Sequence, residues 1–342
     1  MKIKWTRHPV STFADWATSW DAVNHTGSRL PFMDARFIAA ALRHFAAPNS
    51  WLMVGSRHNE PIALGIFTRN RSGLWDTWQP SQLPLGAWLM KEGLGLPALA
   101  HSLLGALPGV SFGVGFSQQD PHLISRPTAG VTTLDYVATA GLTIAGRFED
   151  YWATRGKNLR HNMKRQQAKL EAANTTPQLR CLTDPHDMRE ALKGYADLEA
   201  GSWKAQHGTA VGDDNAQGRF YGEVMHAMAH TGQARVYQYL FDRQVVAMDL
   251  CLTQGPTMVI LKTACRDDLP GLSPAMLMHR DIFSTLFNDA AVSRVEFYGR
   301  VMEWHTRWTD DTRMLYHANF FRFPRLVTLA RRAKQLLSRG QG

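Results

Sequence analysis

The chain has 342 residues, of which 44% are hydrophobic and 20% are charged. This length and composition are typical of a folded protein of about two domains, and they exclude a disordered chain, a collagen and a small disulfide-stapled module. The net charge is +9, and a charge of this size bears on partners and solubility more than on fold. Two runs that contain no acidic residue, 155–169 and 322–339, together carry more positive charge than this net value.

The cysteine spacing and the lengths of the apolar segments bear on the cellular compartment of the protein. Cys181, Cys251 and Cys265 form no C-x-x-C pair and leave one cysteine over, which argues against a disulfide framework and a cysteine zinc site. We find no signal-like start and no run of some 18 apolar residues. We therefore expect a cytoplasmic protein that is neither exported nor membrane-spanning, and we expect no metal.

The predicted elements of the first part of the chain begin with a helix at residues 34–45. Two strands follow at 51–56 and 61–68, joined by a polar turn at 57–60. A third strand at 74–79, a helix at 96–107 and a strand at 110–116 complete the series.

The second part of the chain repeats this order. A basic helix covers 155–170, and a further helix ends at 222–230. Strands are predicted at 234–240, 245–252 and 257–263, a helix at 273–287 and a strand at 294–298. Val245 lies 184 residues after Pro61, and Met258 lies 184 residues after Leu74. This near-constant offset favours a duplication. The order of the elements predicts an α/β fold with two tandem domains, each a mixed twisted sheet flanked by helices.

The boundary between the two copies is expected near residue 140. The predicted domains are 1–140, 141–323 and a basic amphipathic helix at 324–342. This last helix either lies on an anionic membrane surface, as a peripheral contact, or packs on its own domain.

The basic helix at 155–170 has two interpretations. Its apolar positions Leu159, Met163 and Leu170 share one side, and its bases lie largely on the other. It is either a solvated surface helix or a cradle for a phosphorylated ligand or an acidic carrier protein. No motif that reads bases accompanies it, so we expect no DNA partner.

Several blocks in the second half resemble the CelD/BcsL-type acetyltransferases of the GNAT superfamily. The blocks are 148–152, 157–165, 198–204, 208–210, 262–264, 272–274 and 295–299, together with Trp308. Fem-type aminoacyl transferases are more distant relatives of this pattern. The resemblance covers 148–320 well and the first copy only in outline, where such families carry a degenerate GNAT fold.

The resemblance implies an N-acyltransferase. An acyl group would pass from acyl-CoA, or from an acyl carrier protein, to a small polar amine such as an amino sugar or an amino acid, in exopolysaccharide or envelope synthesis. Acyl-CoA is then a cosubstrate, and no cofactor is permanently bound.

In this family the carrier enters between the third strand and the strand after the helix, here 257–263 and 294–298. Its phosphates would bind at the start of that helix, where free N–H groups and the helix dipole favour anions. We expect Ser273 to cap the helix, although Pro274 removes one donor and the loop is poorer in glycine and basic residues than is usual. The donor-binding candidates are Ala264, Cys265, Leu272, Ser273, Ala275 and Met276.

Three residues are the catalytic candidates. Lys262 follows an apolar strand segment, so its side chain either faces a strand edge or points into the cleft, and the resemblance favours the cleft. The resemblance also places Tyr298 where a tyrosine protonates the leaving thiolate. Glu199 ranks first as the base that accepts the amine proton, with a direct water relay as the alternative. The candidates for substrate binding are Trp203, Lys204, Arg160 and Trp308.

Two other functions stay open. One is a Fem-type transferase that takes its acyl group from aminoacyl-tRNA, which the basic helix suits. The other is a non-catalytic GNAT-like subunit that binds a polysaccharide assembly through its basic surfaces.

Overall fold

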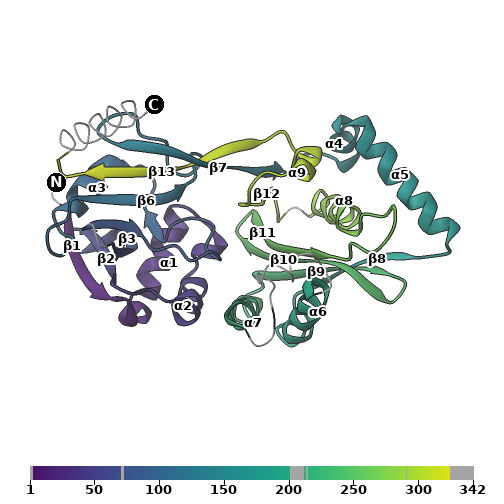
Figure 1. Cartoon of the computed structure of the whole chain (residues 1–342), viewed down its shortest axis with the longest axis horizontal. Helices are drawn as coiled ribbons and strands as arrows, with labels where there is room; N and C mark the ends of the chain where they lie inside the picture. The colour runs from purple at the N-terminus through teal and green to yellow at the C-terminus, as the bar shows by residue number, and fades with distance from the viewer. Residues whose placement is uncertain (1–2, 71–72, 201–211, 213–214, 290, 324–342) are drawn as a thin grey trace, which may run out of the picture.

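A computed structural model describes residues 3–70, 73–200, 212, 215–289 and 291–323 of the chain. Within this part, one long sheet runs through the molecule, with strand order β1-β2-β3-β4-β6-β13-β7-β12-β11-β10-β9-β8 and with β5 paired to β3 (Figure 1). Only β4–β6 and β11–β12 are parallel among these pairs, so the sheet is mixed, as predicted.

The first half supplies the strands at one end of this sheet, the strand β7 and the helices that flank them. They are β1 (Lys4–Pro9), the 3-10 helix η1 (Val10–Trp16), α1 (Ala17–Thr26), η2 (Pro31–Met33), α2 (Ala35–His44), β2 (Ser50–Arg57), β3 (Glu60–Arg69), β4 (Leu74–Thr77), β5 (Trp88–Met90), α3 (Leu96–Leu104), β6 (Gly113–Gln119) and β7 (Thr132–Thr143).

The second half supplies the rest. Its elements are α4 (Phe148–Thr154), α5 (Lys157–Ala172), β8 (Pro177–Leu182), α6 (Met188–Ala200), α7 (Ala216–Ala229), β9 (Ala234–Phe241), β10 (Gln244–Gln254), β11 (Thr257–Cys265), α8 (Pro274–Leu286), β12 (Arg294–Glu296), α9 (Glu303–Trp308) and β13 (Thr312–Phe321). The predicted tail helix at 324–342 lies outside the described residues.

The two halves repeat one unit, which confirms the predicted tandem α/β fold. In the first, the hairpin β2–β3 is followed by β4, α3 and a strand β6 that is parallel to β4. In the second, the hairpin β9–β10 is followed by β11, α8 and a strand β12 that is parallel to β11. Two parallel neighbouring strands need a long crossover connection, usually a helix, and α3 and α8 lie in these connections.

Each half completes its sheet with a strand from the other half. β7 follows β6 in the chain but pairs with β12, whereas β13 follows β12 but pairs with β6. The two exchanged strands also pair with each other, over Thr132–Ala140 and Thr312–Asn319, and Figure 1 shows them crossing between the halves. The predicted boundary near residue 140 falls inside β7, and the division into domains stays a prediction.

The helices form layers on the two faces of the sheet. α1, α2, α6 and α7 bury their apolar side chains in one cluster that spans both halves, and α3 and α8 pack against the opposite face in two separate clusters. Phe37 of α2 and Phe220 of α7 are fully buried, with ring centroids 5.1 Å apart. The shared cluster therefore fixes one half against the other.

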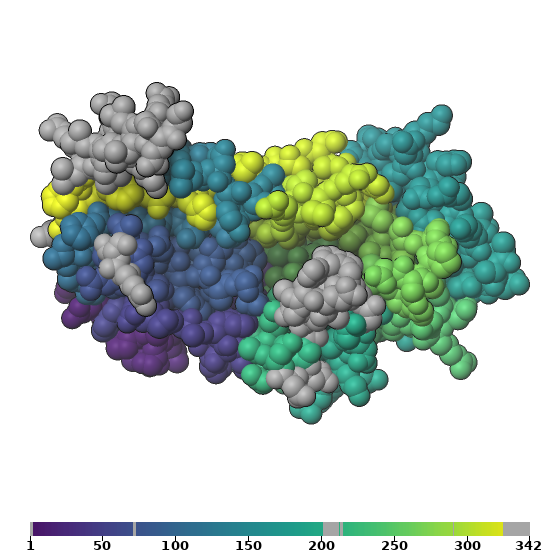
Figure 2. All heavy atoms as spheres, viewed as in Figure 1, coloured from purple at the N-terminus to yellow at the C-terminus, as the bar shows by residue number. Residues whose placement is uncertain are grey.

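The basic helix α5 has the predicted amphipathic form. Leu159, Met163, Gln166 and Leu170 are buried, whereas Lys164 and Arg165 are exposed. In Figure 2, α4 and α5 form one end of the molecule, away from the first half. Among the described residues, no helix has the length and apolar character needed to cross a bilayer.

Candidate active site

The parallel strands β11 and β12 separate shortly after they begin. They pair only at Thr257, Met258 and Val259, opposite Arg294, Val295 and Glu296. Beyond this point the chain after β12 stays with β7, because the N–H groups of Phe297 and Val301 donate to carbonyls of Ala140 and Ala138. β11 instead continues beside β10 as far as Cys265. The backbone pairing of the two strands therefore ends here, at the place where the resemblance implies that the carrier enters, and we call this gap in the pairing the opening.

A bulge in β11 lies at the start of this opening. Cys251 and Leu250 are adjacent on β10 but face Ile260 and Lys262, so Leu261 is an extra residue on β11. A bulge bends its strand and changes the direction of the side chains that follow. Lys262 is the first residue beyond it.

Lys262 packs against helix α7. Its Nζ lies 3.5 Å from Oε1 of Gln217 and 5.7 Å from the centre of the Tyr221 ring. Gln217 and Tyr221 are four residues apart and therefore share one face of α7. Lys262 is half-buried, and its ammonium group points toward helix α7.

Glu199 belongs to the same group of polar side chains. It is fully buried at the end of α6, and its Oε1 accepts a hydrogen bond of 3.4 Å from the hydroxyl of Tyr195. Burial, and then the charge of Glu199, raises the pKa of Tyr195 and that of Tyr221. The structure thus brings together Lys262 and Glu199, which the sequence singled out. It adds Tyr195, Tyr221 and Gln217, which the sequence analysis missed.

Tyr298 lies on the other side of the opening, just after β12. Its φ is +47°, an unusual value for a residue with a side chain. Its buried hydroxyl donates to Oδ2 of Asp120 at 2.9 Å, and the Arg313 guanidinium lies 5.4 Å from its ring centre. Burial, and then the charges of Asp120 and Glu296, raises the pKa of Tyr298 well above its usual value. In this structure its hydroxyl donates its hydrogen bond to Asp120, and the proposed donation to a thiolate stays a prediction.

Asp120 and Arg313 were not predicted as site residues. Arg313 of β13 donates to Asp120 at 2.8 and 2.6 Å and to Glu296 at 2.7 Å, and all three side chains are buried. Burial favours the neutral form of Asp120, but the hydrogen bonds and charge of Arg313 outweigh it and lower the pKa of this carboxyl group. Asp120 comes from the first half, so the wall of the opening depends on both halves.

Helix α8 begins beside the opening, where the sequence predicts an anion site. Ser273 is its N-cap residue, but the predicted capping bond is wrong because the Ser273 side chain makes no such hydrogen bond. Its backbone N–H donates instead to Oε1 of Gln166 on α5, at 2.6 Å. Pro274 has no N–H to offer.

A lysine of the basic helix reaches the same place. Gly271 has a φ of +70°, and a side chain there would collide with Nζ of Lys169. An ammonium group next to a helix N-terminus puts two positive ends together, an arrangement that an anion would stabilise. Of the other donor-site candidates, Met276 is buried and Leu272 and Ala275 are half-buried.

A buried polar group lies on the α8 side of β11. Asp249 accepts hydrogen bonds from the Thr263 hydroxyl at 2.6 Å and pairs with Nε2 of His279 at 2.9 Å. The His279 ring stacks on Trp304 of α9, with centroids 5.2 Å apart. This stack joins the helix after β11 to the helix after β12. Ala264 is buried on the opposite face of β11 and Cys265 is half-buried on the face toward α8.

Two of the four predicted substrate-binding residues, Arg160 and Trp308, lie in the part of the chain that the structure describes. Trp203 and Lys204 lie outside the described residues. Arg160 is half-buried on α5, and its Nε donates to the carbonyl of Arg155 at 3.1 Å. Trp308 is fully buried and stacks on Trp152 in the core, with ring centroids 5.9 Å apart. Their roles stay predictions.

The matching place in the first half is closed. β4 pairs with β6 over three residues and ends one residue later, at Thr77. The Thr77 hydroxyl accepts the N–H of Ser117 on β6 at 2.9 Å, and the Ser117 carbonyl accepts the N–H of Gly86 at 3.1 Å. These bonds hold the strands together where β11 and β12 separate. Across the described ranges, no cluster of three His, Cys, Asp or Glu side chains could hold a metal.

A mixed sheet whose two parallel strands separate beside the N-terminus of their crossover helix is the architecture of GNAT acyltransferases. Residues 157–335 match the family model described as the acetyltransferase (GNAT) domain. This match spans more than half of the chain, and the chain belongs to that family. Domains of this family use acyl-CoA as a cosubstrate.

Solved structures share the whole fold at low identity. The C-terminal domain (DUF2156) of a putative lysylphosphatidylglycerol synthetase from Agrobacterium fabrum is 14% identical, with a TM-score of 0.57 over 91% of this chain and 92% of that chain. A conserved protein of unknown function from Bacteroides thetaiotaomicron VPI-5482 is 10% identical, with a TM-score of 0.54 over 93% and 98%. FemX is 8% identical, with a TM-score of 0.51 over 82% and 90%. No curated protein matches the sequence.

Proposed function

We propose that the chain is an N-acyltransferase whose reaction takes place in the opening between β11 and β12. The observation that carries this proposal is the separation of the two strands after Val259 and Glu296. Lys262 lies just beyond it and faces the Tyr221 ring, on which the charge of the buried Glu199 also acts. The closed strands of the first half support a single site, in the second half.

The reaction follows from the groups around the opening. The amine nitrogen of the acceptor attacks the carbonyl carbon of the acyl donor, and the bond from this carbon to the carrier's sulfur breaks. Glu199 accepts the proton that the amine loses, and the ammonium group of Lys262 stabilises the negative charge that develops on the carbonyl oxygen. The departing thiolate takes up a proton, for which Tyr298 is the candidate donor.

The donor's charged part would bind at the start of α8. Lys169 and the N-terminal turn supply positive charge at that end of the opening. Acyl-CoA is the donor that we propose first, with a small polar amine as the acceptor. A role in exopolysaccharide or envelope synthesis, and the CelD/BcsL-type specificity, stay predictions.

One feature favours a second donor, aminoacyl-tRNA. Pro274 and the bond from Ser273 N–H to Gln166 remove backbone donors that a pyrophosphate would use. FemX and the lysylphosphatidylglycerol synthetase domain share the fold of this chain. An aminoacyl ester reacts by the same attack, with an oxygen in place of the sulfur as the leaving atom.

A transfer assay tests the proposal and separates the donors. The purified chain is incubated with a panel of amines and either labelled acetyl-CoA or a labelled mixture of aminoacyl-tRNAs. We expect a labelled amide from one donor, lost in Glu199→Gln. The matched control Glu190→Gln changes an exposed glutamate of the same helix and should keep the activity. An unchanged rate in Glu199→Gln contradicts the assigned base.

A further inference from the structure

A pocket of about 710 Å³ lies between the two halves, away from the candidate active site. Helices α1 and α2 of the first half form one wall, and the ends of β9 and β10 with the turn after β10 form the other. The pocket is near Gln254 and Gly255, at the starting end of β11. Lys262 lies five residues further along this strand than Thr257, a distance of about 17 Å.

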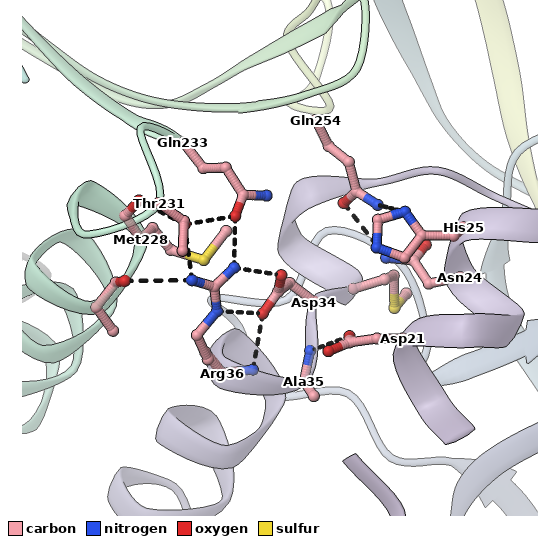
Figure 3. A network of polar contacts seen from close by, with 12 residues as sticks. Asp21, Asn24, His25, Asp34, Ala35, Arg36, Met228, Thr231, Gln233 and Gln254 are labelled. Atoms are coloured by element: carbon pink, nitrogen blue, oxygen red, sulfur yellow. Dashed lines mark hydrogen bonds and ion pairs between the residues drawn. The ribbon is translucent and has the colours of Figure 1, made fainter. Parts of the chain in front are cut away.

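Arg36 lines the pocket and bridges the two halves. Its Nε and Nη2 donate to the two oxygens of Asp34, at 2.8 and 2.7 Å. Its other donors reach Gln233, Thr231 and the carbonyl of Ala227, all in the second half (Figure 3). An arginine has five N–H donors, and these contacts use all of them. Arg36 therefore joins the halves and has no donor left for a ligand.

Most of the other charges of the pocket are also paired. Arg235 donates to Asp289 at 3.1 Å, and Asp34 is neutralised by Arg36. His25 lies 3.4 Å from Nε2 of Gln254, across the junction of the halves. Among these charged groups of the pocket lining, Asp21 has no ion-pair partner in the described residues.

Asp21 is a carboxylate with spare acceptor capacity. Its Oδ1 accepts the N–H of Ala35, the first residue of α2, at 2.7 Å (Figure 3). In the part of the chain that the structure describes, Asp21 makes no further hydrogen bond and no ion pair. Burial, opposed by the bond from Ala35, raises the pKa of this carboxyl group. A cation bound beside Asp21 would relieve the cost of that burial.

The surface around Asp21 is apolar, and except for Phe13 its side chains are small. Phe13, Ala14, Ala17, Ala35 and Ala39 line this part of the pocket. Such a surface accepts methylene groups, and a carboxylate at its edge accepts an ammonium or guanidinium group. The alanine side chains offer no ligand atom to a hydrated metal ion.

We propose that this pocket binds a small aliphatic amine or guanidine, with Asp21 as the partner of its charged end. The ligand contacts both halves, so it binds the assembled chain. This ligand is not the acyl acceptor, because the length of β11 between this pocket and Lys262 keeps its nitrogen away from the opening. The proposal does not depend on the transferase function.

Calorimetry on the full chain tests it with cadaverine and agmatine as the probes and 1,5-pentanediol as the uncharged control. We expect saturable binding of at least one of the two cations at concentrations up to about 10 mM, and none of the diol. In Asp21→Asn the affinity should fall by about tenfold or more. The matched control Asp15→Asn changes an exposed aspartate of η1 outside the pocket and should bind as the unchanged chain does.

A second variant keeps the test valid if Asp21→Asn disturbs α2. Ala39→Phe fills the pocket from its apolar side and leaves Asp21 and its bond to Ala35 in place, so it should abolish binding without changing the thermal unfolding temperature. Equal binding in both variants and the unchanged chain overturns the proposal, as does equal binding of cation and diol. The absence of saturable binding by both cations also overturns it.

Discussion

The Lys262 ammonium lies 5.7 Å from the centre of the Tyr221 ring. Lys262 belongs to β11, just beyond the residues of this strand that pair with β12. A lysine held over an aromatic face, next to a gap in a sheet, keeps its charge close to whatever enters the gap. Replacing Lys262 by Met keeps the length of the side chain and removes the charge.

We expect Lys262→Met to lower kcat about 100-fold, as the loss of one group that stabilises an oxyanion does. KM for the amine should change less, because the charge develops only during the reaction. Steady-state kinetics measures both constants. Lys193→Met, an exposed site on α6, is the control, and equal kinetics in the two variants would remove Lys262 from the reaction.

Glu199 should accept the proton that the acceptor amine loses. Glu199→Gln should lower kcat/KM about 100-fold or more, because the amide that replaces the carboxylate cannot accept a proton. Steady-state kinetics measures this, with Glu190→Gln, an exposed glutamate of the same helix, as the control. Equal kinetics in the two variants would assign the base elsewhere.

The Asp120–Arg313 pair should stabilise the fold at neutral pH. Removal of one member of a buried ion pair leaves the other charge uncompensated, at a cost of about 3 kcal/mol or more. Asp120→Asn should lower the free energy of unfolding by this order, measured by denaturant unfolding.

The pH dependence of that loss follows from the lowered pKa of Asp120. A carboxyl group with a lowered folded-state pKa contributes stability above its unfolded-state pKa, about 3.9, and loses it as the pH falls toward the folded-state value. The difference between the unchanged chain and Asp120→Asn should therefore be constant near neutral pH and shrink below about pH 4. A difference that grows on acidification would contradict the assigned direction.

Lys169 should bind the anionic part of the donor. Lys169→Met should weaken donor binding several-fold at low salt, and the effect should shrink as salt screens the remaining charges. Titration of the donor at two salt concentrations measures this. Lys164→Met, on an exposed position of the same helix, is the control, and an equal loss in both variants would indicate only the general charge of α5.

Phe220 should stabilise the packing of the two halves against each other. Its ring is fully buried between Phe37 and Phe45 of the first half. Phe220→Ala should cost about 3–5 kcal/mol, and both halves should still unfold in one transition because of the exchanged strands. Calorimetry that resolves two separate transitions in the unchanged chain would contradict this coupling.

Local sequence patterns were sufficient for the repeated unit. The apolar runs 51–56 and 61–68 and the polar turn between them predict the hairpin β2–β3, and the spacing of Leu159, Met163 and Leu170 predicts the buried face of α5. The ends of elements were less accurate. β12 stops at Glu296 and not at residue 298, because Tyr298 takes a positive φ and bonds to Asp120, which lies 178 residues away in the chain.

The exchange of β7 and β13 was not predicted for the same reason, since no local pattern shows which distant strand a strand will join. The site was predicted in part. Lys262 and Glu199 were named, whereas Tyr195 and Tyr221 look like ordinary apolar positions of α6 and α7. The i, i+4 spacing of Tyr195 with Glu199, and of Gln217 with Tyr221, was the signal available in the sequence.

Hydrogen exchange with and without the donor that supports turnover tests the central claim most directly. If the carrier enters between β11 and β12, the amides of residues 260–265 and 275–277 should exchange more slowly when the donor is bound, and those of β4 should not change. Protection confined to the first half, or none at 260–265 with saturating donor, would contradict the account.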